Sequence, residues 1–224
     1  MIARVDIAIW SDVMCPWCVV GYKNLERALA MPDGEIVAEV CWLPFELNPD
    51  MPAEGEESRA HIARKYGRTP EQAEASRTML ADRARAAGFP FDYTDEGDPP
   101  PLMMWNTFGA HKLMYWALEK YGAEAQTRLQ LALFAAHFQR RQNVSDHRIL
   151  VEIARSVGFD PGAAKAALNV SSLGDKVRAE QQRAFEQGIT AVPAVEIDSQ
   201  FLVPGAQEPN TYVNVLRKVV ARRT

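Results

Sequence analysis

The tetrapeptide Cys15-Pro16-Trp17-Cys18 is the feature that most constrains this chain. It follows an apolar segment at 3–10 that is typical of a buried strand, and it precedes apolar residues at helical spacing. Cys15 would therefore lie at the N-terminus of a helix, where unpaired backbone N–H groups and the helix dipole favour a thiolate. Cys18, one turn later, would be close enough to attack a mixed disulfide at Cys15. The spacing predicts thiol–disulfide exchange.

Strand patterns occur only near the two ends of the chain. The strand at 3–10 and the helix after Cys18 are followed by a Pro-Asp-Gly sequence at 32–34 and a second strand at 35–43. After Gly188, short strands at 194–197 and 201–203 form a hairpin, and a last helix starts at Pro209. These ends read as a small α/β unit with helices packed on a sheet.

The middle of the chain, from 51 to 187, shows helical patterns and no strand pattern. Thr69 and Gln72 form a predicted capping box, with Pro70 in the first turn, and the acidic segment 92–101 reads as a loop. Helices are expected at 58–67, 69–88, 104–121, 123–140, 146–157, 161–168 and 173–187. We therefore predict a split α/β domain, 1–50 with 188–224, that carries an inserted helical domain, 51–187.

Charge and composition exclude several classes of protein. The 224 residues include 25 Lys and Arg against 29 Asp and Glu, a net charge of −4, which argues against nucleic-acid binding. Three cysteines cannot be fully paired, so a disulfide-rich secreted scaffold is excluded. The chain has no run of 18 apolar residues and no signal-peptide pattern, so we expect a cytoplasmic protein without a membrane partner.

A zinc site is the structural alternative for the cysteines. Cys41 could supply a third thiolate, but a second CxxC or a spaced His pair is missing. Cys41 lies in an apolar strand and is predicted to be core. His61, His137 and His147 show no ligand spacing and are expected at the surface or in the core, so we predict no metal.

The dipeptide Val192-Pro193 is the second informative feature. A proline before a strand is allowed at a strand start or an edge, and a cis bond there would mark a tight turn. With the CxxC motif, these residues make the sequence resemble the DsbA-like branch of the thioredoxin superfamily, and within it the FrnE-type dithiol-disulfide oxidoreductases and isomerases. The resemblance is carried by residues 11–18, 44–49, 106–107, 110–111, 188–193 and 205–207.

The resemblance implies a thioredoxin-like α/β fold with a large all-helical insertion. It implies Cys15 as nucleophile, Cys18 as resolving thiol and Pro193 as a cis-proline beside them. Thiol or disulfide substrates, protein or small molecule, would contact Pro16, Trp17 and Val192. No cofactor is implied beyond glutathione or another thiol as electron partner, and the protein would be a monomer or a homodimer. Some relatives carry a second cysteine pair near the C-terminus, which this chain lacks.

Other polar residues have both a functional and a structural interpretation. Asn106 and His111, on a predicted apolar helix, either line the cleft as substrate-binding groups or serve as a cap and a core histidine. A protonated His111 near Cys15 could stabilise its thiolate. Asp12 is expected to be a hydrogen-bonded turn residue, with proton transfer as the alternative. Trp17 is expected to be partly exposed.

A second enzyme class shares the implied fold. Glutathione-dependent isomerases and transferases, such as 2-hydroxychromene-2-carboxylate isomerase and kappa-type glutathione transferases, commonly have a serine at the first motif position. The intact Cys15–Cys18 pair disfavours that activity, although glutathione could still bind near Val192.

Overall fold

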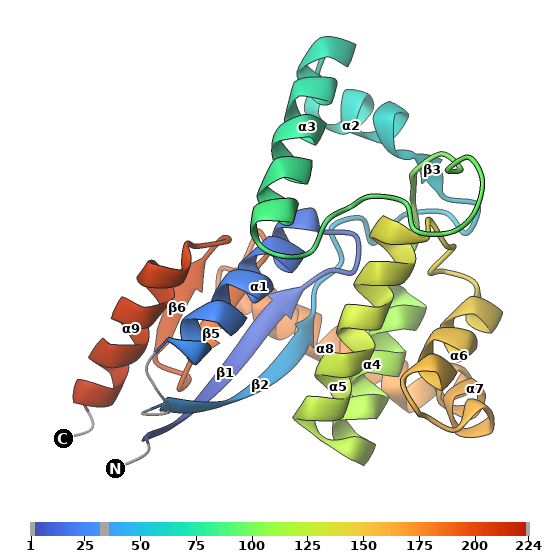
Figure 1. Ribbon diagram of the computed structural model, residues 1–224. Helices are drawn as coiled ribbons and strands as arrows, with labels where there is room; N and C mark the ends of the chain where they lie inside the picture. The colour runs from blue at the N-terminus through green and yellow to red at the C-terminus, as the bar shows by residue number, and fades with distance from the viewer. Residues whose placement is uncertain (1–2, 32–35, 223–224) are drawn as a thin grey trace.

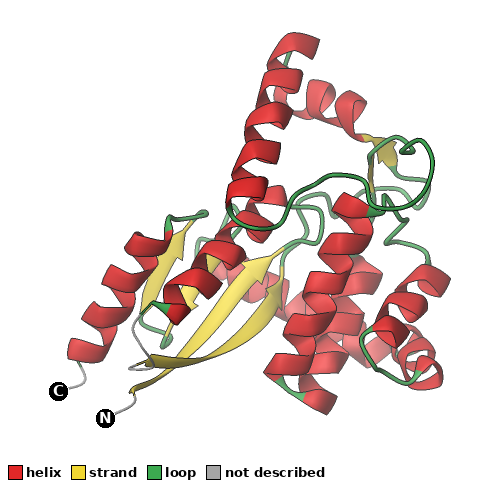
Figure 2. Ribbon diagram, viewed as in Figure 1, coloured by secondary structure: helices red, strands yellow, loops and turns green. Residues whose placement is uncertain are grey.

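The computed structural model describes residues 3–31 and 36–222 and contains both strands and helices (Figure 2). The first predicted strand and helix are β1 (Ala3–Ser11) and α1 (Pro16–Ala30). The second strand is β2 (Ile36–Pro44), and the Pro-Asp-Gly sequence expected to end α1 lies outside the described residues. The predicted hairpin and last helix are confirmed as β5 (Ala194–Ile197), β6 (Phe201–Pro204) and α9 (Pro209–Ala221).

One four-stranded sheet, in the order β2-β1-β5-β6, unites the two ends of the chain. β1 pairs in parallel with β2, so that Ala8 faces Cys41, and antiparallel with β5, so that Ile9 faces Val195. The parallel pair is joined by α1, as a crossover connection requires. Because β5 returns antiparallel beside β1, residues near 193 lie next to the loop that leads into α1.

Helices cover the sheet on both faces. α1 packs against α9 in front of the sheet in Figure 1, while α8 (Ser171–Glu186) passes behind it. Side chains alternate between the two faces of a strand, so Val5, Ile7 and Ile9 of β1 point to the same face, where each is 1% exposed. The site described below lies at the end of β1, within the same cluster of buried residues.

The middle of the chain is mostly helical, as predicted. α2 (Ser58–Tyr66) and α3 (Pro70–Ala86) project from the rest of the molecule in Figure 1, and α3 begins with the predicted Thr69–Gln72 capping box. α4 (Phe108–Tyr121) and α5 (Ala123–Phe134) pack beside β2, and α6 (His147–Ser156) and α7 (Pro161–Asn169) pack against α4 and against each other. The division into domains 1–50 with 188–224 and 51–187 stays a prediction.

Two details of the middle segment differ from the prediction. β3 (Glu56–Glu57) and β4 (Met103–Met104) pair antiparallel, although no strand was expected between 51 and 187. α4 consequently starts at Phe108 rather than at 104. Two-residue strands leave no periodic pattern, because the pairing depends on segments almost 50 residues apart coming together.

The helix expected at 123–140 changes character at its end. α5 stops at Phe134 and continues as the π-helix η1 (Ala135–Gln139), which contains His137. A π-turn widens the helix by one residue and turns the following side chains, a change that an apolar pattern does not report. Within the described residues, the helices are all too short or too polar to cross a bilayer.

A candidate dithiol site at the start of α1

Cys15 occupies the N-cap position of α1, where the sequence places it. Its backbone is extended, with φ −88° and ψ 110°, and its N–H donates to Asp12 O at 3.0 Å. Pro16 fills the first helical turn, where a missing N–H costs nothing, and is half-buried. The Cys15 thiol thus faces the positive end of the helix dipole, an environment that favours an anion.

The second predicted feature lies beside the first. The Val192–Pro193 peptide bond is cis, and the Cys15 thiol donates to Val192 O at 3.5 Å. Pro193 O accepts from Gly205 N at 2.8 Å, which ties this loop to the end of β6. Two segments that are 177 residues apart in the chain therefore form one surface around the thiol.

Gly21 allows α1 to approach this loop. A Cβ atom at position 21 would lie 3.0 Å from Pro193 Cγ and 3.3 Å from Ala206 Cα. Both contacts are tighter than ordinary van der Waals packing, so a side chain here would push α1 away from Pro193.

The two cysteines differ in burial. Cys15 is 3% exposed, whereas Cys18 is 0% exposed and lies inside the core. Burial raises the pKa of Cys18 well above its ordinary value, and a hydrogen bond with Cys15 and its charge add to this effect. Cys18 is therefore a neutral thiol near pH 7, and Cys15 is the group placed to act as the nucleophile.

Asp12 is a hydrogen-bonded turn residue, as predicted. Its Oδ1 atom accepts from Met14 N at 3.2 Å, and its Oδ2 atom accepts from Leu47 N at 2.7 Å. The carboxylate is 1% exposed and fastens the loop before Cys15 to the loop after β2. A buried carboxylate needs such donors, and these two bonds provide them.

His111, on α4, lies next to Asp12 and is 4% exposed. Its Nε2 atom is 3.7 Å from Asp12 Oδ1, too far for a direct hydrogen bond, and has no hydrogen-bond partner among the described residues. It is therefore not the satisfied core histidine of the structural interpretation. The structure brings it to the carboxylate that supports the Cys15 loop.

Sequence reasoning missed the second histidine near Asp12. His137, on η1, is 1% exposed, and its Nδ1 atom has no hydrogen-bond partner in the part of the chain that the structure describes. Burial lowers its pKa to about 3, and the charge of Asp12 opposes this shift. No spacing in the sequence could have found this residue, because the π-turn directs it inward.

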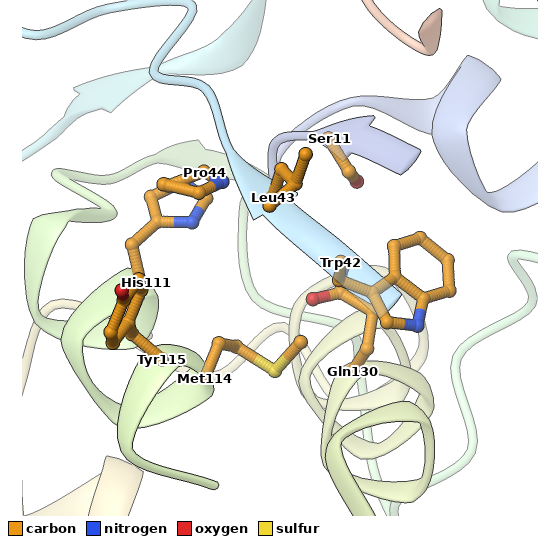
Figure 3. A pocket seen from close by; sticks show the side chains of 8 residues that line it. All are labelled: Ser11, Trp42, Leu43, Pro44, His111, Met114, Tyr115 and Gln130. Carbon is orange, nitrogen blue, oxygen red and sulfur yellow. The ribbon is translucent and has the colours of Figure 1, made fainter. Parts of the chain in front are cut away.

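A small cavity adjoins His111 (Figure 3). Figure 3 shows His111 and Tyr115 on one helix, Gln130 on another and the end of β2 between them. Neither Ser11 nor Gln130 was singled out from the sequence. The lining residues are Ser11, Trp42, Leu43, Pro44, His111, Met114, Tyr115 and Gln130.

Trp17 is half-buried, which agrees with the prediction of partial exposure. It packs against a small apolar cluster made by Val20 of α1 with Ala84 and Ala87 at the end of α3. The projecting α2–α3 segment is therefore anchored directly beside the cysteines.

Asn106 precedes α4 instead of lying on it. Its Oδ1 atom accepts from Phe108 N at 3.0 Å, and its Nδ2 atom donates to Met51 O at 3.1 Å. These bonds match the capping interpretation, and the substrate-binding role of Asn106 stays a prediction.

Cys41 is half-buried rather than a core residue. The prediction was wrong because β2 is an edge strand, and its middle is only partly covered. Burial nevertheless raises the pKa of Cys41 to about 11, with the charge of Glu39 adding to the shift. Across residues 3–31 and 36–222, no three His, Cys, Asp or Glu side chains gather as a metal site requires.

Comparisons with known proteins agree with this geometry. The family model of the DSBA-like thioredoxin domain matches residues 6–217. The Bacillus subtilis (strain 168) protein YwbO is 30% identical over 204 residues, which is 90% of each chain. A crystal structure described as a probable DsbA oxidoreductase from Streptomyces coelicolor is 31% identical, with a TM-score of 0.87 over 98% of this chain and 92% of that one.

More distant structures share the fold. The cytosolic disulfide reductase DsbM from Pseudomonas aeruginosa, solved with GSH, has a TM-score of 0.59 at 14% identity and covers 96% of this chain and 99% of its own. A 2-hydroxychromene-2-carboxylate isomerase has a TM-score of 0.60 at 14% identity, over 97% and 95% of the two chains. Both the leading and the alternative activity therefore occur on this architecture.

Proposed function

The chain belongs to the DSBA-like thioredoxin domain family, and on this premise we propose that it exchanges disulfides through Cys15 and Cys18. The observation that carries the proposal is the position of Cys15, which caps α1 and donates its thiol to Val192 O beside the cis-proline. A helix N-terminus favours the thiolate, and the Val192 loop, whose carbonyl contacts the Cys15 thiol, would offer its backbone to a substrate strand.

The reaction has two steps. The Cys15 thiolate attacks a substrate disulfide, one substrate sulfur leaves as a thiolate, and a mixed disulfide forms. Cys18 then attacks Cys15, releases the second substrate thiol and leaves a Cys15–Cys18 disulfide. Two electrons pass from the protein to the substrate, and an external thiol must then reduce the Cys15–Cys18 disulfide. Oxidation of a dithiol substrate follows the same steps in reverse.

The remaining assignments are parts of the same proposal. Pro16 and Trp17, which follow Cys15 in the chain, and Val192 and Pro193, whose loop contacts the Cys15 thiol, would form the substrate-binding surface. Glutathione is the electron donor that we would test first, supported by the fold shared with a disulfide reductase solved with GSH. The cytoplasmic location stays a prediction.

Three features separate this function from the alternatives. A glutathione isomerase or transferase has no need for a resolving thiol, whereas Cys18 here lies in hydrogen-bonding reach of Cys15. A zinc site would need more ligands than the pair offers. The relative described as a probable DsbA oxidoreductase, at 31% identity, supports the disulfide chemistry.

Reduction of insulin disulfides, with a dithiol as the electron source, tests the proposal. We expect the Cys15→Ser variant to lose at least about 1,000-fold in rate, because a hydroxyl is not ionised near pH 7. Cys41→Ser is the matched control and should retain the rate of the unmodified protein. Activity that survives in Cys15→Ser, or a protein that purifies with one zinc per chain, would overturn the proposal.

A further inference from the structure

A second cavity lies within the helical middle of the chain. It is bordered by the loop between β2 and β3, the starts of α4 and α6 and the end of α7. In Figure 1, these helices lie on the side of the molecule away from α9. The cavity has a volume of about 330 Å³ and opens to solvent. Among the described residues, its lining shares no member with the cavity of Figure 3, the Cys15–Cys18 motif or the cis-proline loop.

Lys112 brings a positive charge to this cavity. It lies on α4, next to His111 in the chain, and is 9% exposed. Its Nζ atom donates to Leu168 O at 2.7 Å, in the last turn of α7, and this bond uses one of the three N–H groups of the ammonium. Lysine is rarely buried to this extent without an acidic partner, because its charge loses hydration.

Acidic side chains do not line this cavity in the part of the chain that the structure describes. Its wall holds one lysine and one histidine, His147, but no Asp or Glu. Asp146, next to His147 in the chain, accepts hydrogen bonds from the backbone and the guanidinium of Arg148 instead. The bond from Lys112 to Leu168 caps α7 but supplies no full counter-charge. In a protein with a net charge of −4, this wall is therefore a local positive region.

Two more side chains in the wall have donors for an anion. Asn106 donates through Nδ2 to Met51 O at 3.1 Å, which uses one of the two N–H bonds of its amide. His147 is exposed at the start of α6, and its ring has an N–H in either neutral tautomer. Together with Lys112, these donors come from the loop before α4, from α6 and from α4. A few polar groups that converge on one cavity are typical of a ligand site.

Phe108 and Leu168 give the cavity an apolar wall. Phe108 packs against α8, where a Cβ atom at Gly174 would lie 3.3 Å from the Phe108 Cζ atom. The Arg178 guanidinium, also on α8, lies 4.1 Å from the centre of the Phe108 ring. These contacts hold the ring in place. A ligand with an apolar body would bury it against Phe108 and Leu168.

We propose that this cavity binds a small organic carboxylate, with the acidic group paired to Lys112 and the apolar body against Phe108 and Leu168. Bidentate recognition of phosphate favours arginine, which the described lining lacks. One buried ammonium with amide and imidazole donors nearby therefore matches a monoanion. The site is independent of the disulfide exchange proposed above, since its ligand needs no contact with Cys15.

Titration of isotope-labelled protein with benzoate, followed by NMR spectroscopy, tests the proposal. We expect saturable shifts of the Gly109 and Lys112 backbone amide signals. Benzamide, which has a similar shape and no charge, should bind at least about tenfold more weakly. Lys112→Met removes the charge and should weaken benzoate binding at least about tenfold, because a hydrogen bond between charged groups is lost. Lys165→Met, at an exposed position of α7, is the matched control and should bind benzoate like the unmodified protein.

His147→Leu tests the cavity at an exposed position, where a substitution puts the fold at little risk. We expect benzoate to bind about two- to tenfold more weakly, because one neutral hydrogen bond is lost. If thermal melting shows that Lys112→Met does not fold, the benzamide comparison and His147→Leu decide.

Four outcomes would overturn the inference: no saturable shift with benzoate, equal binding of benzamide, unchanged affinity in the folded Lys112→Met and His147→Leu variants, or tighter binding of inorganic phosphate than of benzoate. Cys15→Ser should bind benzoate with the affinity of the unmodified protein. A failure of the proposed disulfide exchange is therefore distinguishable from a failure of this site.

Discussion

The start of α1 and the middle of β2 both hold cysteines, in different surroundings. Cys15 lies at a helix N-terminus beside the carbonyl of Val192, with Cys18 one turn away. Cys41 lies in a strand, opposite Ala8 of β1, with its pKa raised to about 11 by burial and by Glu39. Burial favours the neutral thiol at Cys41 and at Cys18.

The two places differ in the polar groups that surround a cysteine. At α1, the first helical turn leaves backbone N–H groups unpaired, and the Cys15 thiol donates to Val192 O. At β2, the N–H and C=O groups are engaged in the ladder with β1, and the neighbouring acidic side chain disfavours a second negative charge. The number of cysteines therefore says less about their reactivity than whether each one lies at a helix N-terminus or within a strand.

The largest expected effect separates the two cysteines of α1. Cys18→Ser should abolish turnover of a protein disulfide while leaving the first attack by Cys15 intact, because the mixed disulfide cannot be resolved. Mass spectrometry of the Cys18→Ser variant after reaction with a disulfide substrate should show one substrate adduct, bound to Cys15. Cys41→Ser, the control, should accumulate none. Normal turnover by Cys18→Ser would mean that Cys18 is not the resolving thiol.

The next effect compares Cys15 with Cys41. A pKa of about 11 against an ordinary 9.0 leaves Cys41 about 100-fold less thiolate at pH 7 than an ordinary cysteine, at tenfold per pKa unit. Peptide mapping after brief treatment with iodoacetamide should find Cys15 modified first. Modification of Cys41 should rise about tenfold per pH unit until pH approaches 11. Equal labelling of the two residues at pH 7 would contradict the comparison.

The smallest effect concerns the fit of α1 against the cis-proline loop. Gly21→Ala should lower the free energy of unfolding by about 1–3 kcal/mol, because its Cβ would press on Pro193 and Ala206. Urea denaturation measures this change. Gly162→Ala on α7, where the nearest atom to a Cβ is a side-chain oxygen of Asp160 at 3.2 Å, is the control. Alanine should be tolerated there or favoured by its helix propensity. Equal effects at both positions would argue against close packing at Pro193.

Local patterns predicted the long elements well. The strand before Cys15, the capping box at Thr69 and the hairpin after Pro193 each follow from residues close together in the chain, so short-range rules apply to them. The paired β3 and β4 and the π-turn at Ala135–Gln139 escaped prediction, because each depends on contacts that no local pattern records.

The sequence alone determined that Cys15 lies at the N-terminus of a helix, because the CxxC motif follows a predicted strand and precedes a predicted helix. It also determined that a proline precedes a strand far along the chain. The tertiary structure decided which other groups meet there. Asp12 is close to Cys15 in the chain, whereas His111 and Gln130 come from α4 and α5, and the packing of these helices against β2 places His111 beside Asp12 and both residues around the cavity of Figure 3. Burial, which raises the pKa of Cys18 and lowers that of His137, is a property of that packing and not of residue type.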